Sequence, residues 1–215
     1  MDARAWDERY AATDLVWSAT PNQFVASELA ELRPGRALDL AAGEGRNALW
    51  LAERGWQVTA VDFSRAGLDK GRALQQRHER GAELRVDWVH ADVLTYGAEP
   101  ASYDLVVLAY LQLTADQRRT AVRRGFEALR VGGTFFVVAH DSTNLSEGTG
   151  GPTDPAVLFT AEEVLGDLDG ERFEVERAER VARTVVAPSS AAGTHEHHGD
   201  ERRTAYDALV RLVRT

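Results

Sequence analysis

The chain of 215 residues has no cysteine, no apolar run of membrane-spanning length and no excess of positive charge. Without cysteine it can form neither disulfides nor thiolate metal sites, and this composition fits a reducing compartment. Its opening residues are charged and lack the apolar core of a signal peptide, so we expect a cytoplasmic protein with no membrane partner. The 25 basic and 34 acidic side chains give a net charge of −9, which argues against nucleic acid as a partner.

Segments typical of strands and helices alternate along the chain, which predicts a parallel sheet covered by helices on both faces. The chain is 44% hydrophobic, is long enough for one core, and has no evident linker. Residues 141–155 and 182–203 are polar and are expected to be loops, and between them Thr160 and Glu163 form a capping box that starts a short helix. The expected strands are 37–40, 57–62, 84–90, 103–109, 134–139, 173–181 and 205–213, and the expected helices are 24–32, 46–54, 65–80 and 115–130.

A turn of small residues follows the first expected strand, in the sequence Asp39-Leu40-Ala41-Ala42-Gly43-Glu44-Gly45. Gly43 and Gly45 let the backbone turn tightly and allow a ligand to approach its N–H groups. The glycine spacing also matches the G-x-G-x-x-A pattern of dinucleotide-binding proteins, which is a weak signal alone. A carboxylate beside such a turn gains nothing from a diphosphate, so Asp39 favours a cationic ligand, unless it only braces the turn.

Acidic residues also end the next two expected strands. Asp62 lies roughly 20 residues beyond the glycine turn, where a carboxylate accepts the ribose hydroxyls of a nucleotide-like ligand. It could instead cap the following helix, a role equally open to Ser64. Phe63 is placed either to cover an adenine or to fill the core. Asp92 ends the third strand, where the dinucleotide pattern requires no acid; a plain turn-forming role is the alternative.

These motifs resemble those of class I S-adenosylmethionine (SAM) dependent methyltransferases. The family's Asp-x-Gly-x-Gly-x-Gly motif matches Asp39 to Gly45 with Ala41 at the first glycine. Residues 103–107 resemble a further family motif, as do residues 128–133, in which Val131 stands at a usual proline, so the resemblance covers 36–140. The opening Trp6-Asp7-Glu8-Arg9-Tyr10, with Trp17 and Pro21-Asn22, is similar to the N-terminal lid of small-molecule methyltransferases of the tellurite-resistance and thiopurine type.

The resemblance implies a Rossmann-like α/β fold, a three-layer sandwich around a doubly wound, mostly parallel seven-stranded sheet whose last strand is antiparallel. One domain would span residues 1–215, with a helical lid at 1–35, a SAM-binding core at 36–140 and a substrate-side part at 141–215. SAM would be the cofactor and S-adenosylhomocysteine its product, with Asp92 and the backbone of Val93 holding the adenine. The implied cofactor-binding residues are Tyr10, Trp17, Asp39, Ala41, Gly43, Gly45, Asp62, Phe63, Asp92, Val93 and Ala109.

Residues that follow the fourth and later strands are the candidates for the acceptor side, because ligands of open α/β sheets bind at the carboxyl ends of the strands. A histidine there would serve as a base for an acceptor that carries a proton, and Asp141 is placed to orient His140. Residues 195–198 reach this edge if the sixth strand is parallel, although the same loop permits a solvated role or a metal site; we expect no metal. The catalytic candidates are Tyr110, His140, His195, His197 and His198.

The kind of acceptor is inferred from missing motifs. No Asn/Asp-Pro-Pro-Tyr/Phe sequence follows the fourth strand, and no cysteine is available to attack a pyrimidine ring. We therefore expect methyl transfer from SAM to a small molecule by in-line displacement, in which positioning carries most of the catalysis. An NAD-dependent oxidoreductase built on the glycine pattern and a SAM-binding protein without chemistry are the alternatives.

Overall fold

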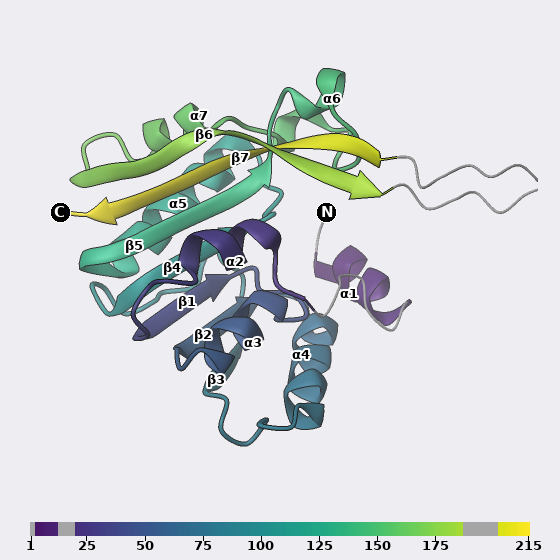
Figure 1. The fold of residues 1–215 in the computed structure, drawn as a ribbon, viewed down its shortest axis with the longest axis vertical. Coiled ribbons are helices and arrows are strands. Elements are labelled where there is room, and N and C mark those ends of the chain that lie inside the picture. Colours follow the sequence, from purple (N-terminus) through teal and green to yellow (C-terminus); the bar gives the residue numbers. More distant parts are fainter. Residues whose placement is uncertain (1–2, 13–19, 187–201) are drawn as a thin grey trace, which may run out of the picture.

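The computed structural model describes residues 3–12, 20–186 and 202–215. Its sheet has the strand order β3-β2-β1-β4-β5-β7-β6 (Figure 1). The strands are β1 (Arg36–Leu40), β2 (Gln57–Asp62), β3 (Val86–His90), β4 (Tyr103–Ala109), β5 (Leu129–His140), β6 (Phe173–Val186) and β7 (Arg202–Arg214). The helices are α1 (Ala3–Ala11), α2 (Gln23–Leu29), α3 (Arg46–Glu53), α4 (Arg65–Arg77), α5 (Ala115–Ala128), α6 (Asn144–Glu147) and α7 (Ala161–Asp167), with a 3₁₀ turn at Pro155–Val157.

The strand directions match the expected topology. Strands β1 to β5 are parallel to one another, and β7 is antiparallel to both β5 and β6. β6 therefore runs in the direction of β5, and the last strand alone is reversed. The strand order turns back between β1 and β4, and the chain leaves these neighbouring strands toward opposite faces of the sheet, which opens a crevice at their carboxyl ends.

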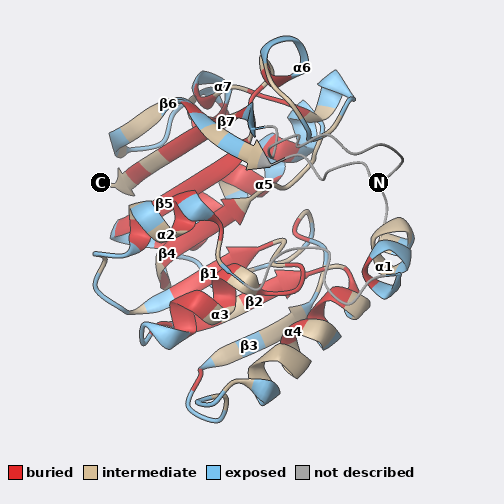
Figure 2. Ribbon diagram, turned by 45° about the vertical axis from the view of Figure 1, so that its right-hand side comes forward, coloured by how far each residue is buried: buried red, intermediate tan, exposed pale blue. Residues whose placement is uncertain are grey.

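Apolar residues fill both faces of the sheet because successive side chains of a strand point to opposite sides. Leu38 of β1 packs in a cluster with Phe126 of α5, whereas Ala37 belongs to a second cluster with Leu51 of α3. The buried strands consequently lie between two helical layers (Figure 2). This arrangement confirms the expected three-layer α/β fold.

Helix starts follow the local signals in the sequence. The Thr160 hydroxyl accepts a hydrogen bond from the backbone N–H of Glu163 at 3.3 Å, and the Glu163 carboxylate accepts one from the backbone N–H of Thr160 at 2.8 Å. The capping box expected at α7 is therefore present. At α4 the hydroxyl of Ser64 caps the helix by accepting from the N–H of Gly67 at 3.1 Å, so the cap role left open between Ser64 and Asp62 belongs to Ser64.

Some boundaries differ from the expected ones. β5 begins at Leu129, because Leu129 already pairs with Tyr103 of β4. The loop expected over 182–203 is partly strand: β6 continues to Val186 and pairs it with Arg202 at the start of β7. Antiparallel neighbours satisfy each other's backbone groups whatever side chains they carry, so polar residues do not end these strands. The expected loop over 141–155 also contains the short helix α6.

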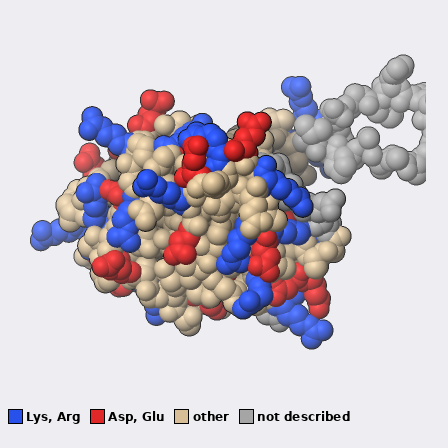
Figure 3. All heavy atoms as spheres, turned by 90° about the horizontal axis from the view of Figure 1, so that it is seen from below, with Lys and Arg blue, Asp and Glu red and all other residues tan. Residues whose placement is uncertain are grey.

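Charged side chains of both signs are interspersed on the face drawn in Figure 3, which carries no continuous basic patch. Neighbouring opposite charges pair, as Arg72 with Asp69 and Arg80 with Glu83 do at 2.7 and 2.8 Å. Among the described residues, no helix combines the length and the apolar character needed to cross a membrane.

Candidate functional site

A cavity of about 630 Å³ opens at the carboxyl ends of β1, β2, β3 and β4. Small-molecule sites commonly measure roughly 300–1,000 Å³, so this space is large enough for a nucleoside with a second ligand beside it. The sequence-predicted residues that line the cavity are Tyr10, Ala41, Gly43, Asp62, Phe63, Asp92, Val93, Ala109 and Tyr110.

Other lining residues were missed by sequence reasoning. They are Ala3, Trp6, Ala42, Arg46, Asn47, Leu94, Leu111, Gln112, Leu113, Thr114, Gln117, Asp154 and Val157. The run from Leu111 to Gln117 directly follows a buried parallel strand, and this position could have identified it. Asp154 and Val157 lie in a long loop without apolar periodicity, so no pattern in the sequence marks them.

The turn after β1 uses left-handed backbone at alternate positions: φ is +62° at Ala41, +56° at Gly43 and +76° at Gly45. The N–H of Gly43 donates to Oδ2 of Asp62 at 2.8 Å, which ties the turn to the end of β2. A Cβ at Gly43 would lie 2.5 Å from the hydroxyl oxygen of Tyr10, so only glycine admits this close approach. Gly43 therefore lines the cavity, and its cofactor role stays a prediction.

Gly45 has a different surrounding. A Cβ there would lie 2.2 Å from the Trp88 ring, which also packs against Gly71 of α4. Gly45 is not among the cavity-lining residues, so its described contact is with a tryptophan between α3 and α4, and its cofactor role stays a prediction.

Asp62 is buried and joins the two elements that meet at the cavity. Its second oxygen, Oδ1, accepts from the N–H of Ser64 at 2.8 Å. Burial raises the pKa of Asp62, and the hydrogen bonds from Ser64 and Gly43 act in the opposite direction. Each carboxylate oxygen has about two lone pairs, so both can accept a further hydrogen bond from a ligand.

Asp39 is 1% exposed and is not among the residues that line the cavity. Its Oδ2 is buried without a hydrogen-bond partner. Burial, followed by repulsion from Asp62, raises the pKa of Asp39 to about 7, and the positive charge of Arg46 acts in the opposite direction. The structure therefore places a carboxyl group of unusually high pKa directly behind the glycine turn.

Helix α1 forms one wall of the cavity and is held against the start of α4. One oxygen of Asp7 accepts from the Ser64 hydroxyl at 2.5 Å and from the N–H of Ala66 at 3.1 Å. Tyr10 is buried next to Gly43, and its ring lies 5.5 Å from that of Trp6. Helix α1 therefore lines the cavity, and the lid role of residues 1–35 stays a prediction. Trp17 lies outside the described residues.

Phe63, Asp92 and Val93 line the cavity at the ends of β2 and β3. Oδ1 of Asp92 accepts from the N–H of Leu94 at 2.8 Å, and the side chain is otherwise exposed to the cavity mouth. This local bond is the turn-forming role left open above. It occupies one oxygen only and leaves the other for a ligand.

On the other side of the cavity, Tyr110 follows β4 with φ of +58°, an uncommon conformation for a bulky side chain. Its hydroxyl donates to Oδ2 of Asp207 at 2.8 Å, and Nε of Arg183 donates to the same oxygen at 2.8 Å. Burial opposes ionisation of Asp207, but its contacts with His140, Arg183 and Tyr110 outweigh burial and lower its pKa. Burial and then the Asp207 charge raise the pKa of Tyr110.

The acid beside His140 is Asp207 of β7, so the expectation that Asp141 orients this ring is wrong. Nδ1 of His140 lies 3.3 Å from Oδ1 of Asp207, an ion-pair distance without hydrogen-bond geometry. Asp141 instead turns into the following loop and accepts from the N–H and hydroxyl of Thr143. His140 is not among the cavity-lining residues, so its role as a base stays a prediction.

The remaining catalytic candidates, His195, His197 and His198, lie outside the described residues. β6 is parallel to β5, as the prediction for this segment required. Over the ranges that the structure describes, no three His, Asp or Glu side chains come together in a way that could hold a metal ion.

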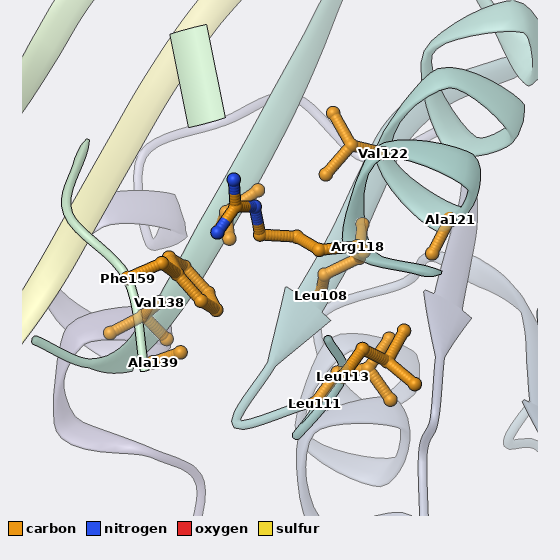
Figure 4. Close-up of a pocket in the computed structure, with 10 residues that line it drawn as sticks. Leu108, Leu111, Leu113, Arg118, Ala121, Val122, Val138, Ala139 and Phe159 are labelled. Carbon is orange, nitrogen blue, oxygen red and sulfur yellow. The ribbon is translucent and has the colours of Figure 1, made fainter. Parts of the chain in front are cut away.

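A second cavity lies between the sheet and α5 and measures only about 10 Å³ (Figure 4). Leu108, Leu113 and Phe159 are among its apolar walls, and Arg118 extends along it toward its buried partner Asp167, with Nε 2.6 Å from Oδ2. This space holds about one water molecule, and the ion pair that crosses it joins α5 to α7. It is a packing feature and not a ligand site.

Comparison with known proteins gives a consistent result. Residues 37–133 match the family model described as a methyltransferase domain. A demethylmenaquinone methyltransferase from Clavibacter sepedonicus is 32% identical over 124 residues, which cover 58% of this chain and 47% of that protein. A tRNA 5-carboxymethoxyuridine methyltransferase from Escherichia coli K12 is 32% identical over 123 residues, which cover 54% of this chain and 45% of that protein. The chain thus spans about half the length of these curated relatives.

Solved structures share the fold over most of the chain. One, described as "Conversion of a Disulfide Bond into a Thioacetal Group during Echinomycin Biosynthesis", has a TM-score of 0.72 at 21% identity and covers 99% of this chain and 92% of the other. The structure of TehB from Haemophilus influenzae has a TM-score of 0.71 at 18% identity and covers 91% of this chain and 63% of the other. At these identities the likeness shows the fold alone.

Proposed function

Residues 37–133 form a class I methyltransferase domain, and on that premise we propose that this protein transfers a methyl group from SAM to a small-molecule acceptor. The observation that carries the proposal is the cavity at the carboxyl ends of β1 to β4, which brings nine separately predicted residues onto one surface. SAM is the cofactor, and S-adenosylhomocysteine is the product that it leaves.

The charges at the cavity fit SAM better than a dinucleotide. SAM has a positive ammonium and a positive sulfonium and no phosphate. Asp62 and Asp92 line the cavity, and Asp39 lies behind the turn with an unpartnered oxygen. The carboxylates of Asp62 and Asp92 would repel a diphosphate placed at the same edge, whereas they favour a cation. The NAD-dependent alternative is therefore the weaker one.

The residues present match the parts of SAM. Asp62 has free lone pairs for the ribose hydroxyls, and Asp92 has one oxygen for the adenine amino group. Phe63 and Val93 supply apolar surface beside them. The lid residue Tyr10 closes the cavity above Gly43.

SAM supplies a methyl group on a sulfonium, which is already an activated leaving group. The protein's part is to hold the acceptor in line with that group and to exclude water, which together lower the barrier by several kcal/mol, of the order of 5. Tyr110 and the residues after it form the wall of the acceptor side. Asp207 restrains the Tyr110 ring at this wall through the 2.8 Å hydrogen bond.

The acceptor side supports a small molecule with an apolar body. Leu111, Leu113 and Val157 provide apolar surface, and Gln112 and Asp154 provide polar groups. One relative acts on tRNA, by its name. The described lining includes a single basic residue against three acids, and the net charge of −9 opposes binding to a polyanion.

Calorimetric titration of the full chain with SAM, S-adenosylhomocysteine and NADH tests the cofactor. We expect binding of the first two and none of NADH. Asp62→Ala should weaken SAM binding at least tenfold, because a buried pair of acceptors is lost. Asp87→Ala on the exposed surface of β3 is the matched control and should bind as the wild type does. Binding of NADH in place of SAM would refute the proposal.

Methyl transfer itself is tested by the release of S-adenosylhomocysteine with a panel of thiol, amine, hydroxyl and carbon-acid acceptors. Turnover with any small acceptor supports the proposal. SAM binding without turnover across all four classes would indicate a binding protein without chemistry.

A further inference from the structure

Asp154 is the charged lining residue of the cavity that the cofactor does not explain. Among the described lining residues, the other charged side chains are Arg46, Asp62 and Asp92, which follow β1, β2 and β3. Asp154 instead lies between β5 and α7, directly before the 3₁₀ turn Pro155–Val157. It therefore serves either a ligand other than the cofactor or the local structure alone.

The charge of Asp154 is not neutralised within the described part of the chain. The one hydrogen bond of its side chain there is from the N–H of Ala156 to Oδ1 at 2.9 Å, and the carboxylate forms no ion pair. The preceding acid in the sequence, Glu147 of α6, differs because it pairs with Arg180 at 2.6 Å. Oδ2 of Asp154 is thus available to a donor that enters the cavity.

The 3₁₀ turn holds this carboxylate at the cavity wall. A 3₁₀ helix has three residues per turn, so positions three apart lie on the same side of it. Asp154 and Val157 stand in that relation, and both line the cavity. The hydrogen bond from Ala156 and the fixed φ of Pro155 restrict the carboxylate, so it loses little freedom when it binds a ligand.

Apolar side chains line the same cavity. Leu111 and Leu113, which follow β4, and Val157 of the turn are all half-buried. A carboxylate beside apolar groups attracts a cation more strongly than one surrounded by water. Asp154 itself is exposed, so solvent limits this attraction to a moderate size. The net charge of −9 also favours the approach of a cation from solution.

We propose that the methyl acceptor carries a cationic group beside its apolar body and that Asp154 binds this group, an inference that rests on the proposed function. The cation is a protonated amine or a quaternary ammonium. It is separate from the methylated atom, because the atom that attacks the methyl group needs a free electron pair, which an ammonium lacks. Asp154 is then a specificity-determining residue, and Leu111, Leu113 and Val157 cover the apolar body.

A simpler role for Asp154 is to cap the 3₁₀ turn, and two substitutions separate the roles. Asparagine caps as well as aspartate does, so Asp154→Asn removes the charge and keeps the cap, whereas Asp154→Ala removes both. If capping is the only role, Asp154→Asn should bind every ligand as the wild type does. If the charge binds the acceptor, both variants should lose the preference for a cation.

Three probes share a phenyl body and differ in charge: phenethylammonium, phenethyl alcohol and hydrocinnamate. Their dissociation constants are measured by calorimetry at pH 7 on the full chain saturated with S-adenosylhomocysteine. We expect the wild type to bind the ammonium roughly 3- to 10-fold more tightly than the alcohol, the range of one partly screened ion pair, and the carboxylate most weakly. Asp154→Asn should bind the ammonium and the alcohol equally.

Asp169→Asn, an exposed acid after α7 that does not line the cavity, is the matched control and should keep the wild-type preference. Equal constants for the ammonium and the alcohol in the wild type, no binding of the ammonium, or a preference that survives in Asp154→Asn would overturn this inference alone. A wild-type protein that binds neither SAM nor S-adenosylhomocysteine would overturn the proposed function, so the two failures are distinguishable.

Discussion

Replacing Asp39 by asparagine should stabilise the ligand-free protein at pH 8 and leave it nearly unchanged at pH 4. Burial and the nearby Asp62 raise the pKa of Asp39 from 3.8 to about 7. In the unfolded chain this carboxyl ionises near its ordinary pKa, whereas in the folded protein it keeps its proton until about pH 7. Unfolding between these values releases a proton, so the wild type loses stability as the pH rises through this window.

The size of the effect follows from the shift. A difference of about 3 pKa units, at about 1.36 kcal/mol each, means that ionising Asp39 lowers the free energy of unfolding of the wild type by at most about 4 kcal/mol above pH 7. Asparagine has nearly the same shape and cannot ionise, so it removes this dependence on pH. Relaxation of the protein and entry of water reduce this effect. We expect the difference in free energy of unfolding between Asp39→Asn and the wild type to be about 1–4 kcal/mol larger at pH 8 than at pH 4.

Urea unfolding of the wild type and Asp39→Asn at pH 4, 6 and 8 measures this difference. Asp87→Asn, an exposed acid, should show no such dependence. If Asp39 ionises to pair with the ammonium of SAM, the wild type should also bind SAM more tightly at pH 8 than at pH 6, and the variant should not. A stability difference between wild type and Asp39→Asn that is the same at all three pH values would refute the reasoning.

Three further substitutions test the packing at Gly45, the hydrogen bond between Tyr110 and Asp207, and the attachment of α1. Gly45→Ala should lower the free energy of unfolding in urea by about 1–3 kcal/mol more than Gly132→Ala does. Both glycines have φ near +77°, but a Cβ at Gly45 would lie 2.2 Å from the Trp88 ring, whereas a Cβ at Gly132 would have nothing within 4 Å. Equal losses for the two variants would contradict the clash with Trp88. Asp207→Asn should lower the pKa of Tyr110, because the second cause that raises it is removed. Absorbance titration with Tyr110→Phe as the blank measures it, and an unchanged pKa would remove Asp207 as the partner. Asp7→Ala should release α1 and speed proteolysis near the N-terminus at pH 7. The hydrogen bond from Ser64 lowers the pKa of Asp7, so its stabilising contribution is complete above the ordinary pKa of an aspartate and is lost as the pH falls through the lowered pKa. Cleavage at the wild-type rate would show that this hydrogen bond does not hold α1 in place.

The cavity lining at the ends of β1 and β2 could be predicted because its signals are local. Strands β1 and β2 are short apolar runs, each followed within a few residues by the acids and glycines that shape the cavity. Parallel strands bring their carboxyl ends to one edge, so the position of Asp62 and Asp92 in the sequence is enough to place them together. The same argument predicts that Ala109 and Tyr110, at the carboxyl end of β4, lie at this edge.

The contacts around Tyr110 could not be predicted in the same way, because they depend on strand pairing over long separations. His140 lies directly opposite Asp207 in the antiparallel pair of β5 and β7. Arg183 reaches the same carboxylate from β6, where it is two residues from Val181, the register partner of Asp207. Alternation in a strand shows which face a residue occupies but not which residue stands opposite, so Asp207 carried no signal.

Two of the three non-glycine residues with positive φ among the described residues lie at this cavity, Ala41 after β1 and Tyr110 after β4. Such conformations cost about 1–3 kcal/mol each and persist only where the surrounding structure holds them. At Tyr110 the holding groups are visible: Asp207 binds its hydroxyl, and the carbonyl of Val138 accepts from its N–H at 2.7 Å. At Ala41, where the family motif has glycine, the next residue's N–H donates to the carbonyl of Val61 at 3.0 Å and fixes the turn on β2. Because β1 and β4 are neighbours, both strained residues lie where the strand order reverses, and their strain is compensated by the contacts that give the cavity its shape.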